Sequence, residues 1–160
     1  MELFLAAAYA KRDHVALLSF RGQKAELLLP PTRSLAQTKQ RLRGLPGGGG
    51  TPLAAGLHLA LDTPIRARKH GMTPTHALLT DGRANVALDG TPGRSAAESV
   101  ARQMARLVRS GGISALVLDV SMRPQPGLAE LALEMGARYV PLPRAQAAVL
   151  AGTLGVALAG

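Results

Sequence analysis

The chain has 160 residues, which fits one domain with a sizeable core; 47% of the residues are hydrophobic but only 2% are aromatic. Because it contains no cysteine, a disulfide framework, a thiolate metal site and a cysteine nucleophile are excluded. The net charge of +9 is compatible with nucleic acid, but two Phe and two Tyr offer little base stacking and no binding motif is present, so the sequence favours a solvated basic face or an acidic protein partner.

Helices and strands are predicted to alternate along the chain. In the first half of the chain we expect a helix over 1–11, strands over 14–20 and 24–29, a helix opened by Ser34, and a helix from Pro52 that Pro64 kinks or ends. A strand over 75–80 and an exposed loop over 81–93 follow. In the second half we expect a helix capped by Ser95, a strand over 113–120, a helix over 126–135, a strand over 138–142 and a helix over 144–158. The first two strands are close enough to form an antiparallel hairpin at a sheet edge. This order predicts one α/β domain, a doubly wound and mostly parallel sheet with one antiparallel edge strand.

Two short stretches point to a binding site. The glycine run 47–50 ends at Thr51 and Pro52, and the apolar strand 75–80 ends at Asp81 and Gly82. In a parallel sheet, a loop that enters a helix and the carboxyl end of a strand converge on the edge where ligands bind. A hydroxyl and a carboxylate at that edge suit Mg²⁺, which prefers oxygen ligands. Thr51 could instead cap a helix, and Asp81 could be an ordinary turn residue.

The other polar candidates are weaker. Asp119 ends the strand 113–120 at the same sheet edge, and Arg83 and Asn85, just after Asp81, could hydrogen-bond a partner's carboxylate. The glycine run lacks the ending of a phosphate-binding loop, and the four histidines lack metal-ligand spacing. We expect His58 and His76 to have structural or surface roles. We identify no catalytic residue and no complete active site, which leaves open whether the domain is part of an enzyme.

Gly-Gly-Thr-Pro, followed about thirty residues later by Leu-Thr-Asp-Gly, resembles the von Willebrand factor A domain. The resemblance implies that Thr51 and Asp81 belong to a metal-ion-dependent adhesion site. The stretches 13–22, 25–32 and 80–85 are similar to the C-terminal domain of the D subunits of magnesium chelatases, from chlorophyll and bacteriochlorophyll synthesis. The similarity covers almost the whole chain.

The chain departs from the family at one point. The family's first strand carries Asp-x-Ser-x-Ser, the other half of the metal site, and this sequence contains no such motif. Residues 1–10 are predicted to be the helix that follows that strand, so we expect an N-terminally truncated domain over 1–160 that lacks its first central strand and has a partial metal site. The strands 14–20 and 75–80 should then lie about 10 Å apart and unpaired, because adjacent strands are about 4.8 Å apart.

The resemblance implies a binding module within a hetero-oligomeric complex. Its partners would be an AAA+ ATPase subunit and the large porphyrin-binding subunit, which together insert Mg²⁺ into protoporphyrin IX. Mg²⁺ would bridge the domain to a carboxylate of the partner, and ATP would enter only through the partner subunits or an absent AAA+ module. No apolar run approaches the roughly 20 residues of a membrane span, so we expect a cytoplasmic location. Two alternatives stay open: a partner of another AAA+ ATPase, and a small α/β enzyme or nucleotide-binding protein.

Overall fold

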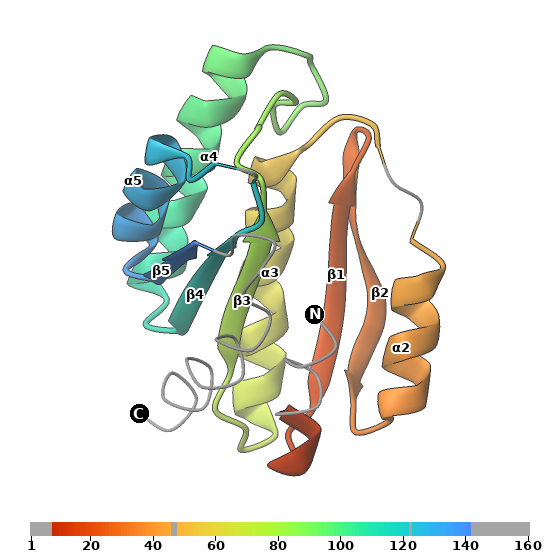
Figure 1. Ribbon diagram of the computed structural model, residues 1–160. Helices are drawn as coiled ribbons and strands as arrows, with labels where there is room; N and C mark the ends of the chain where they lie inside the picture. Colours follow the sequence, from red (N-terminus) through yellow and green to blue (C-terminus); the bar gives the residue numbers. More distant parts are fainter. Residues whose placement is uncertain (1–7, 46–47, 122, 142–160) are drawn as a thin grey trace.

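The computed structural model describes residues 8–45, 48–121 and 123–141. Figure 1 shows strands and helices alternating after an initial hairpin. The elements are β1 (Val15–Arg21), β2 (Lys24–Thr32), α2 (Leu35–Arg43), α3 (Leu53–Lys69), β3 (Thr75–Thr80), α4 (Arg94–Ser110), β4 (Ser114–Asp119), α5 (Pro126–Met135) and β5 (Arg138–Pro141). Within these described ranges, no helix combines the length and the apolar character that are needed to cross a membrane.

The strands form two separate sheets. β3, β4 and β5 form a parallel sheet in that order, and β1 pairs with β2 as an antiparallel hairpin turned by Gly22, whose φ of 66° suits glycine. The expected α/β fold with a parallel sheet and an antiparallel edge strand is confirmed. In the described residues β1 and β3 share no backbone ladder, as expected if a strand is missing between them. In the view of Figure 1, α3 lies between β3 and β1.

The main core lies between the parallel sheet and the helices α3, α4 and α5. Apolar residues recur on the inward face of each helix because a helix repeats every 3.6 residues. The buried members of this core are Leu53, Ala54, Leu57, Leu78, Ala84, Ala97, Ala101, Ala105, Val108, Val117, Leu128, Leu131, Ala132 and Met135. Leu116 and Leu118 alternate with Val117 along β4 and form a smaller cluster on the opposite face of the sheet.

The two predicted helix caps have different outcomes. Ser34 caps α2 as expected, because its hydroxyl accepts the backbone N–H of Gln37 at 3.3 Å. The cap predicted at Ser95 is wrong: the cap residue is Gly93, two positions earlier, and Glu98 accepts a hydrogen bond from the Arg94 side chain at 2.7 Å. An acid four residues after an arginine on an exposed helix turn pairs with it, so Glu98 is not available to the backbone.

Proline and loop predictions also need correction. α3 continues through the buried Pro64 to Lys69, and β2 continues through Pro30 and Pro31, which an edge strand tolerates because one side of it needs no N–H. The 81–93 loop is only partly exposed, because Ala84, Val86 and Ala87 are buried. The helix predicted over 144–158 and most of the helix predicted over 1–11 lie outside the described residues.

Candidate functional site

A pocket lies at the carboxyl ends of β1 and β3. Its volume is about 320 Å³. Its lining residues come from β1, the segment after α2, the 48–51 loop and the position after β3: Ser19, Phe20, Arg21, Leu45, Gly48, Gly49, Gly50, Thr51 and Asp81. The structure therefore brings the two predicted metal ligands, Thr51 and Asp81, to the same pocket although 30 positions separate them.

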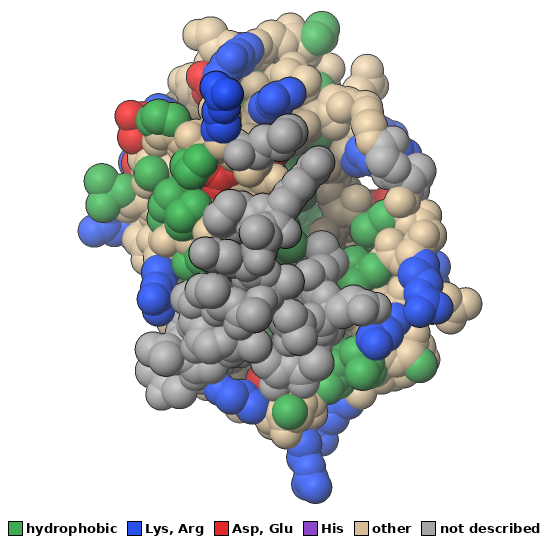
Figure 2. Space-filling view, in the orientation of Figure 1, with side chains coloured by type: hydrophobic (Ala, Val, Ile, Leu, Met, Phe, Trp, Pro, Cys, Tyr) green, Lys and Arg blue, Asp and Glu red, His purple; other side chains and the backbone are tan. Residues whose placement is uncertain are grey.

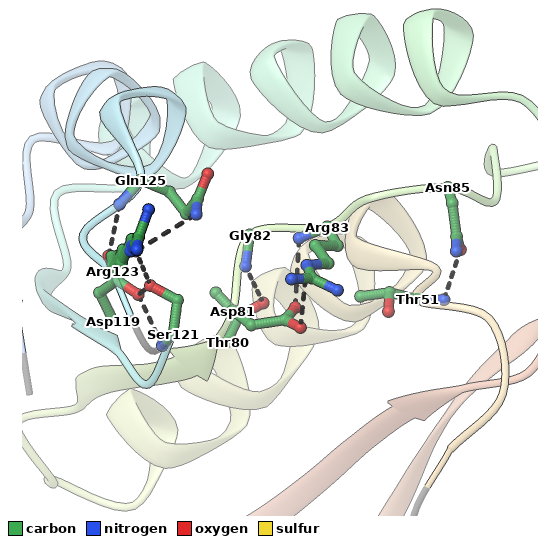
Figure 3. Close-up of polar contacts among 10 residues, drawn as sticks. All are labelled: Thr51, Thr80, Asp81, Gly82, Arg83, Asn85, Asp119, Ser121, Arg123 and Gln125. Carbon is green, nitrogen blue, oxygen red and sulfur yellow. Dashed lines mark hydrogen bonds and ion pairs between the residues drawn. The ribbon is translucent and has the colours of Figure 1, made fainter. Parts of the chain in front are cut away.

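Asp81 leaves β3 in a tight turn that aims its carboxylate along the sheet edge. Its Oδ1 accepts the backbone N–H of Arg83 at 3.2 Å, and its Oδ2 lies 3.8 Å from the Arg83 Nε. Figure 3 shows the Arg83 side chain next to this carboxylate, on the side toward Thr51. The Asp81 side chain is 44% exposed and the Arg83 side chain 77%. An exposed ion pair of this kind contributes only about 0–1 kcal/mol, so a divalent cation can displace the guanidinium from the carboxylate.

The turn after β3 is built around Gly82. Its φ is 76°, and a Cβ there would lie 2.5 Å from Cγ of Leu128 on α5. The buried Thr80 accepts the Gly82 N–H through its hydroxyl at 3.1 Å. Packing against α5 thus fixes the direction in which the chain carries Asp81, and only glycine fits this position.

Thr51 is held through its main chain. Its N–H donates to Oδ1 of Asn85 at 2.7 Å, and its carbonyl accepts the N–H of Asn85 at 3.3 Å (Figure 3). The alternative in which Thr51 caps α3 is not observed: the residue at the cap position is Pro52, and α3 begins with no side-chain cap. The Thr51 side chain therefore has no capping role at α3, which leaves its hydroxyl for the pocket.

The two predicted partner contacts occupy different positions. The Arg83 side chain is largely exposed beside Asp81 and can reach a molecule that docks on this edge. Asn85 is also exposed, but its amide oxygen is turned inward to Thr51. Their contact with a partner stays a prediction.

Asp119 lies on the same sheet edge but belongs to a separate cluster, to one side of Asp81 and Thr51 in Figure 3. It is only 1% exposed, and it accepts hydrogen bonds from the Tyr139 hydroxyl at 2.6 Å, the Gln125 N–H at 3.0 Å and the Ser121 N–H at 2.9 Å. Burial alone would raise the pKa of Asp119, but the hydrogen bonds from Ser121, Tyr139 and Gln125 outweigh it and hold the pKa below its ordinary value. With its oxygens engaged in this way, Asp119 fastens β4 to α5 and β5.

The sequence did not single out Ser19, a residue of β1 that lines the pocket. It lies in a nearly continuous apolar run, so nothing in the local pattern distinguished it from a residue buried in a sheet. Its place in the pocket became apparent only from the structure. Among the described residues, no group of three or more His, Cys, Asp or Glu side chains could hold a metal by itself.

The family is decided by a match to the von Willebrand factor type A domain over residues 1–83. The chain belongs to this family. Two solved structures share the fold of this A domain: the SpRpn10 VWA domain, with a TM-score of 0.70, 11% identity and coverage of 96% of this chain and 78% of that one, and the von Willebrand factor domain of the type V pili tip protein Mfa5 from Porphyromonas gingivalis, with a TM-score of 0.74, 13% identity and coverage of 99% and 86%.

Several relatives of this chain are magnesium-chelatase subunits. The A domain is 60% identical to the magnesium-chelatase 60 kDa subunit of Cereibacter sphaeroides over 158 residues, which is 99% of this chain and 28% of that subunit. It is 56% identical to the 60 kDa subunit of Rhodobacter capsulatus over the same shares, and 38% identical to the 67 kDa subunit of Chlorobaculum parvum over 89% of this chain and 25% of that subunit. The chain thus spans about a quarter of the length of these relatives.

Proposed function

We propose that this A domain is the Mg²⁺-dependent protein-binding module of a magnesium chelatase D subunit. The observation that carries the proposal is the convergence of Thr51 and Asp81 on one open pocket, in a chain 60% identical to a magnesium-chelatase subunit. The domain supplies no catalytic residue in this proposal. It docks the D subunit onto an AAA+ ATPase subunit, and the assembled hetero-oligomer, with its large porphyrin-binding subunit, uses ATP to insert Mg²⁺ into protoporphyrin IX in the cytoplasm.

The donor set fits a bridging Mg²⁺. Thr51 and Asp81 offer a hydroxyl and a carboxylate, the hard oxygen ligands that Mg²⁺ prefers, and Asp81 is 44% exposed and therefore accessible. Two protein oxygens leave positions for water, for an Asp-x-Ser-x-Ser motif outside this chain and for a partner's carboxylate. Bound there, the ion would supply an electrostatic bridge between two proteins, distinct from the Mg²⁺ inserted into the porphyrin.

Arg83 extends the same docking edge. A cation at Asp81 would release the Arg83 guanidinium from its weak ion pair, and a free guanidinium can hold a carboxylate with two parallel hydrogen bonds. The partner segment that this edge fits therefore carries one acidic side chain for the metal and a second acceptor for Arg83. The amide nitrogen of Asn85 is a further donor at this edge.

The test is a pull-down of the AAA+ subunit by the full-length D subunit, with Mg²⁺ and with EDTA. We expect Asp81→Ala to reduce binding in the Mg²⁺ sample to the level seen with EDTA, because the carboxylate among the described pocket residues is lost, and Thr51→Ala to cause a smaller loss. Stability should change by no more than about 0.5 kcal/mol, because both sites are at the surface. The matched control is Asp62→Ala, which removes an exposed carboxylate from α3 away from the pocket. Binding by Asp81→Ala at the wild-type level, insensitive to EDTA, would overturn the proposal.

A further inference from the structure

The metal ligand Thr51 reaches the pocket on a loop that has little rigidity of its own. Residues 48–50 are three glycines, and Gly48 and Gly49 have φ values of 83° and 96°. Glycine loses the most conformational freedom on folding, so such a loop holds one geometry only where other groups fix it. What fixes the 48–51 loop therefore decides where the Thr51 hydroxyl lies.

Two neighbours hold the loop from opposite sides. On the hairpin side, the N–H of Gly22 donates to the Gly50 carbonyl at 2.8 Å. On the other side, Asn85 forms the two hydrogen bonds with the Thr51 main chain described above. The fit is tight, because a Cβ on Gly50 would lie 2.6 Å from the Gly22 carbonyl oxygen and 2.7 Å from Cγ2 of Val86.

Asn85 is itself well anchored. Its carbonyl accepts the Gly93 N–H at 3.0 Å, and both of its neighbours, Ala84 and Val86, are buried at 2% and 7% exposure. A bridge between Val86 and Pro92 closes the loop beyond it. Asn85 also follows Asp81 by only four residues. One short, anchored segment therefore contains Asp81 and hydrogen-bonds the main chain of Thr51.

We infer that Asn85 is a positioning residue: it clamps Thr51 against the segment that carries Asp81 and so sets the distance between the two metal ligands. This inference rests on the proposed metal site. The clamp explains why the amide oxygen of Asn85 is turned to the Thr51 N–H although the side chain lies at the surface, where water could satisfy it.

The clamp is tested in the full-length protein with two readouts: Mg²⁺ affinity by calorimetry, and hydrogen exchange of the Thr51 amide by NMR. Asn85→Ala removes the acceptor, and we expect Mg²⁺ affinity to fall roughly three- to tenfold, the range for one lost hydrogen bond, while the Thr51 amide exchanges several-fold faster. Asn85→Asp keeps an acceptor oxygen at the same place, so Thr51 amide protection should return. The matched control is Thr91→Val, which removes the hydroxyl bond from Thr91 to Asp89 in the same loop and should leave both readouts at wild-type values.

The two readouts separate this inference from the function on which it rests. Wild-type exchange at Thr51 in Asn85→Ala would overturn the clamp. Faster exchange at Thr51 with unchanged Mg²⁺ affinity would overturn the positioning role. If Asp81→Ala binds Mg²⁺ as well as the wild type, the metal site itself fails, and the exchange measurement still decides whether Asn85 holds Thr51.

Discussion

Asp119 is the buried carboxylate on which the ends of β4 and β5 and the start of α5 depend. Its folded-state pKa lies below the ordinary value, so by linkage it contributes stability that is present above the unfolded pKa of about 4 and is lost as pH falls through the folded value. Its partner Tyr139 shows the opposite shift: burial and the bond to Asp119 raise the tyrosine pKa to about 12. The Tyr139 contribution is therefore present below pH ~10 and is lost as pH rises through the folded value.

We expect Asp119→Asn to lower the free energy of unfolding at pH 7 by about 2–3 kcal/mol, because an amide group cannot accept all the hydrogen bonds that the carboxylate accepts. The variant should also lose less stability than the wild type as pH falls below the ordinary aspartate pKa of about 4, because it has no carboxylate to protonate at this position. Urea denaturation at several pH values measures both effects. Glu130→Gln is the control, since its side chain is 58% exposed. Parallel pH curves for Asp119→Asn and the wild type would contradict this account.

At the residue scale, the sequence was enough to bring Thr51 and Asp81 to one pocket, while their role as metal ligands stays a prediction. Thr51 and Asp81 could be placed together because a loop before a helix and a strand's carboxyl end share an edge. The role of the Asn85 side chain could not be predicted, since its partner is a backbone N–H 34 residues away and any polar residue in a loop could have formed such a bond. Likewise, nothing in the sequence shows that Asp119 would meet Tyr139, because the register of β4 against β5 decides it.

At the scale of elements, the β3–Gly82–α5 contact ties the pocket edge of the sheet to the core. Gly82 and Gly90 both have positive φ, at 76° and 86°, but a Cβ at Gly82 would collide with Leu128 whereas nothing lies within 4 Å at Gly90. We expect both alanine variants to lose about 1 kcal/mol from backbone strain, and Gly82→Ala to lose a further 1–3 kcal/mol from overpacking. Thermal unfolding of the matched pair measures the difference, and equal losses would show that α5 yields to the added methyl group.

The element predictions from sequence failed where tertiary packing outweighs local rules. Of the two outcomes predicted at Pro64, a kink or an end of the helix, the end is not observed: the loss of one helical hydrogen bond is tolerated where the ring is fully buried against its neighbours. The Ser95 cap failed because Arg94 and Glu98 pair along the first turn instead. The strands themselves were predicted well, since their apolar runs are short and each is bounded by glycine, proline or a charged residue.

At the scale of the whole molecule, the alternation of strands and helices was enough to predict the fold class, and a family match confirms it. The net charge carries less information. Figure 2 shows Lys and Arg side chains scattered over this face rather than gathered into one stripe, and several arginines are already paired with Glu98, Glu130 or Glu134. On this face the distribution is not the continuous basic track that backbone phosphates require.

The separation of the two sheets has a consequence for how the domain unfolds. β1 and β2 pack against α3. The ring of Phe20 on β1 lies against Gly56 on α3, so close that a Cβ on Gly56 would be 2.6 Å from Cδ1 of Phe20. Without a shared ladder, the hairpin and the parallel sheet should open as separate cooperative units. We expect Phe20→Ala to accelerate native-state hydrogen exchange in β1 and β2 and to leave β4 unchanged. Equal acceleration in β4 would show a single unit.

Because the pocket is lined by β1 on one side and by Asp81 on the other, it exists only while both units are folded. A ligand that contacts both sides therefore binds only when both units are folded. By mass action it stabilises each unit against unfolding. We therefore expect two thermal unfolding transitions without a ligand and one with the pocket occupied, so the number of transitions reports on ligand binding.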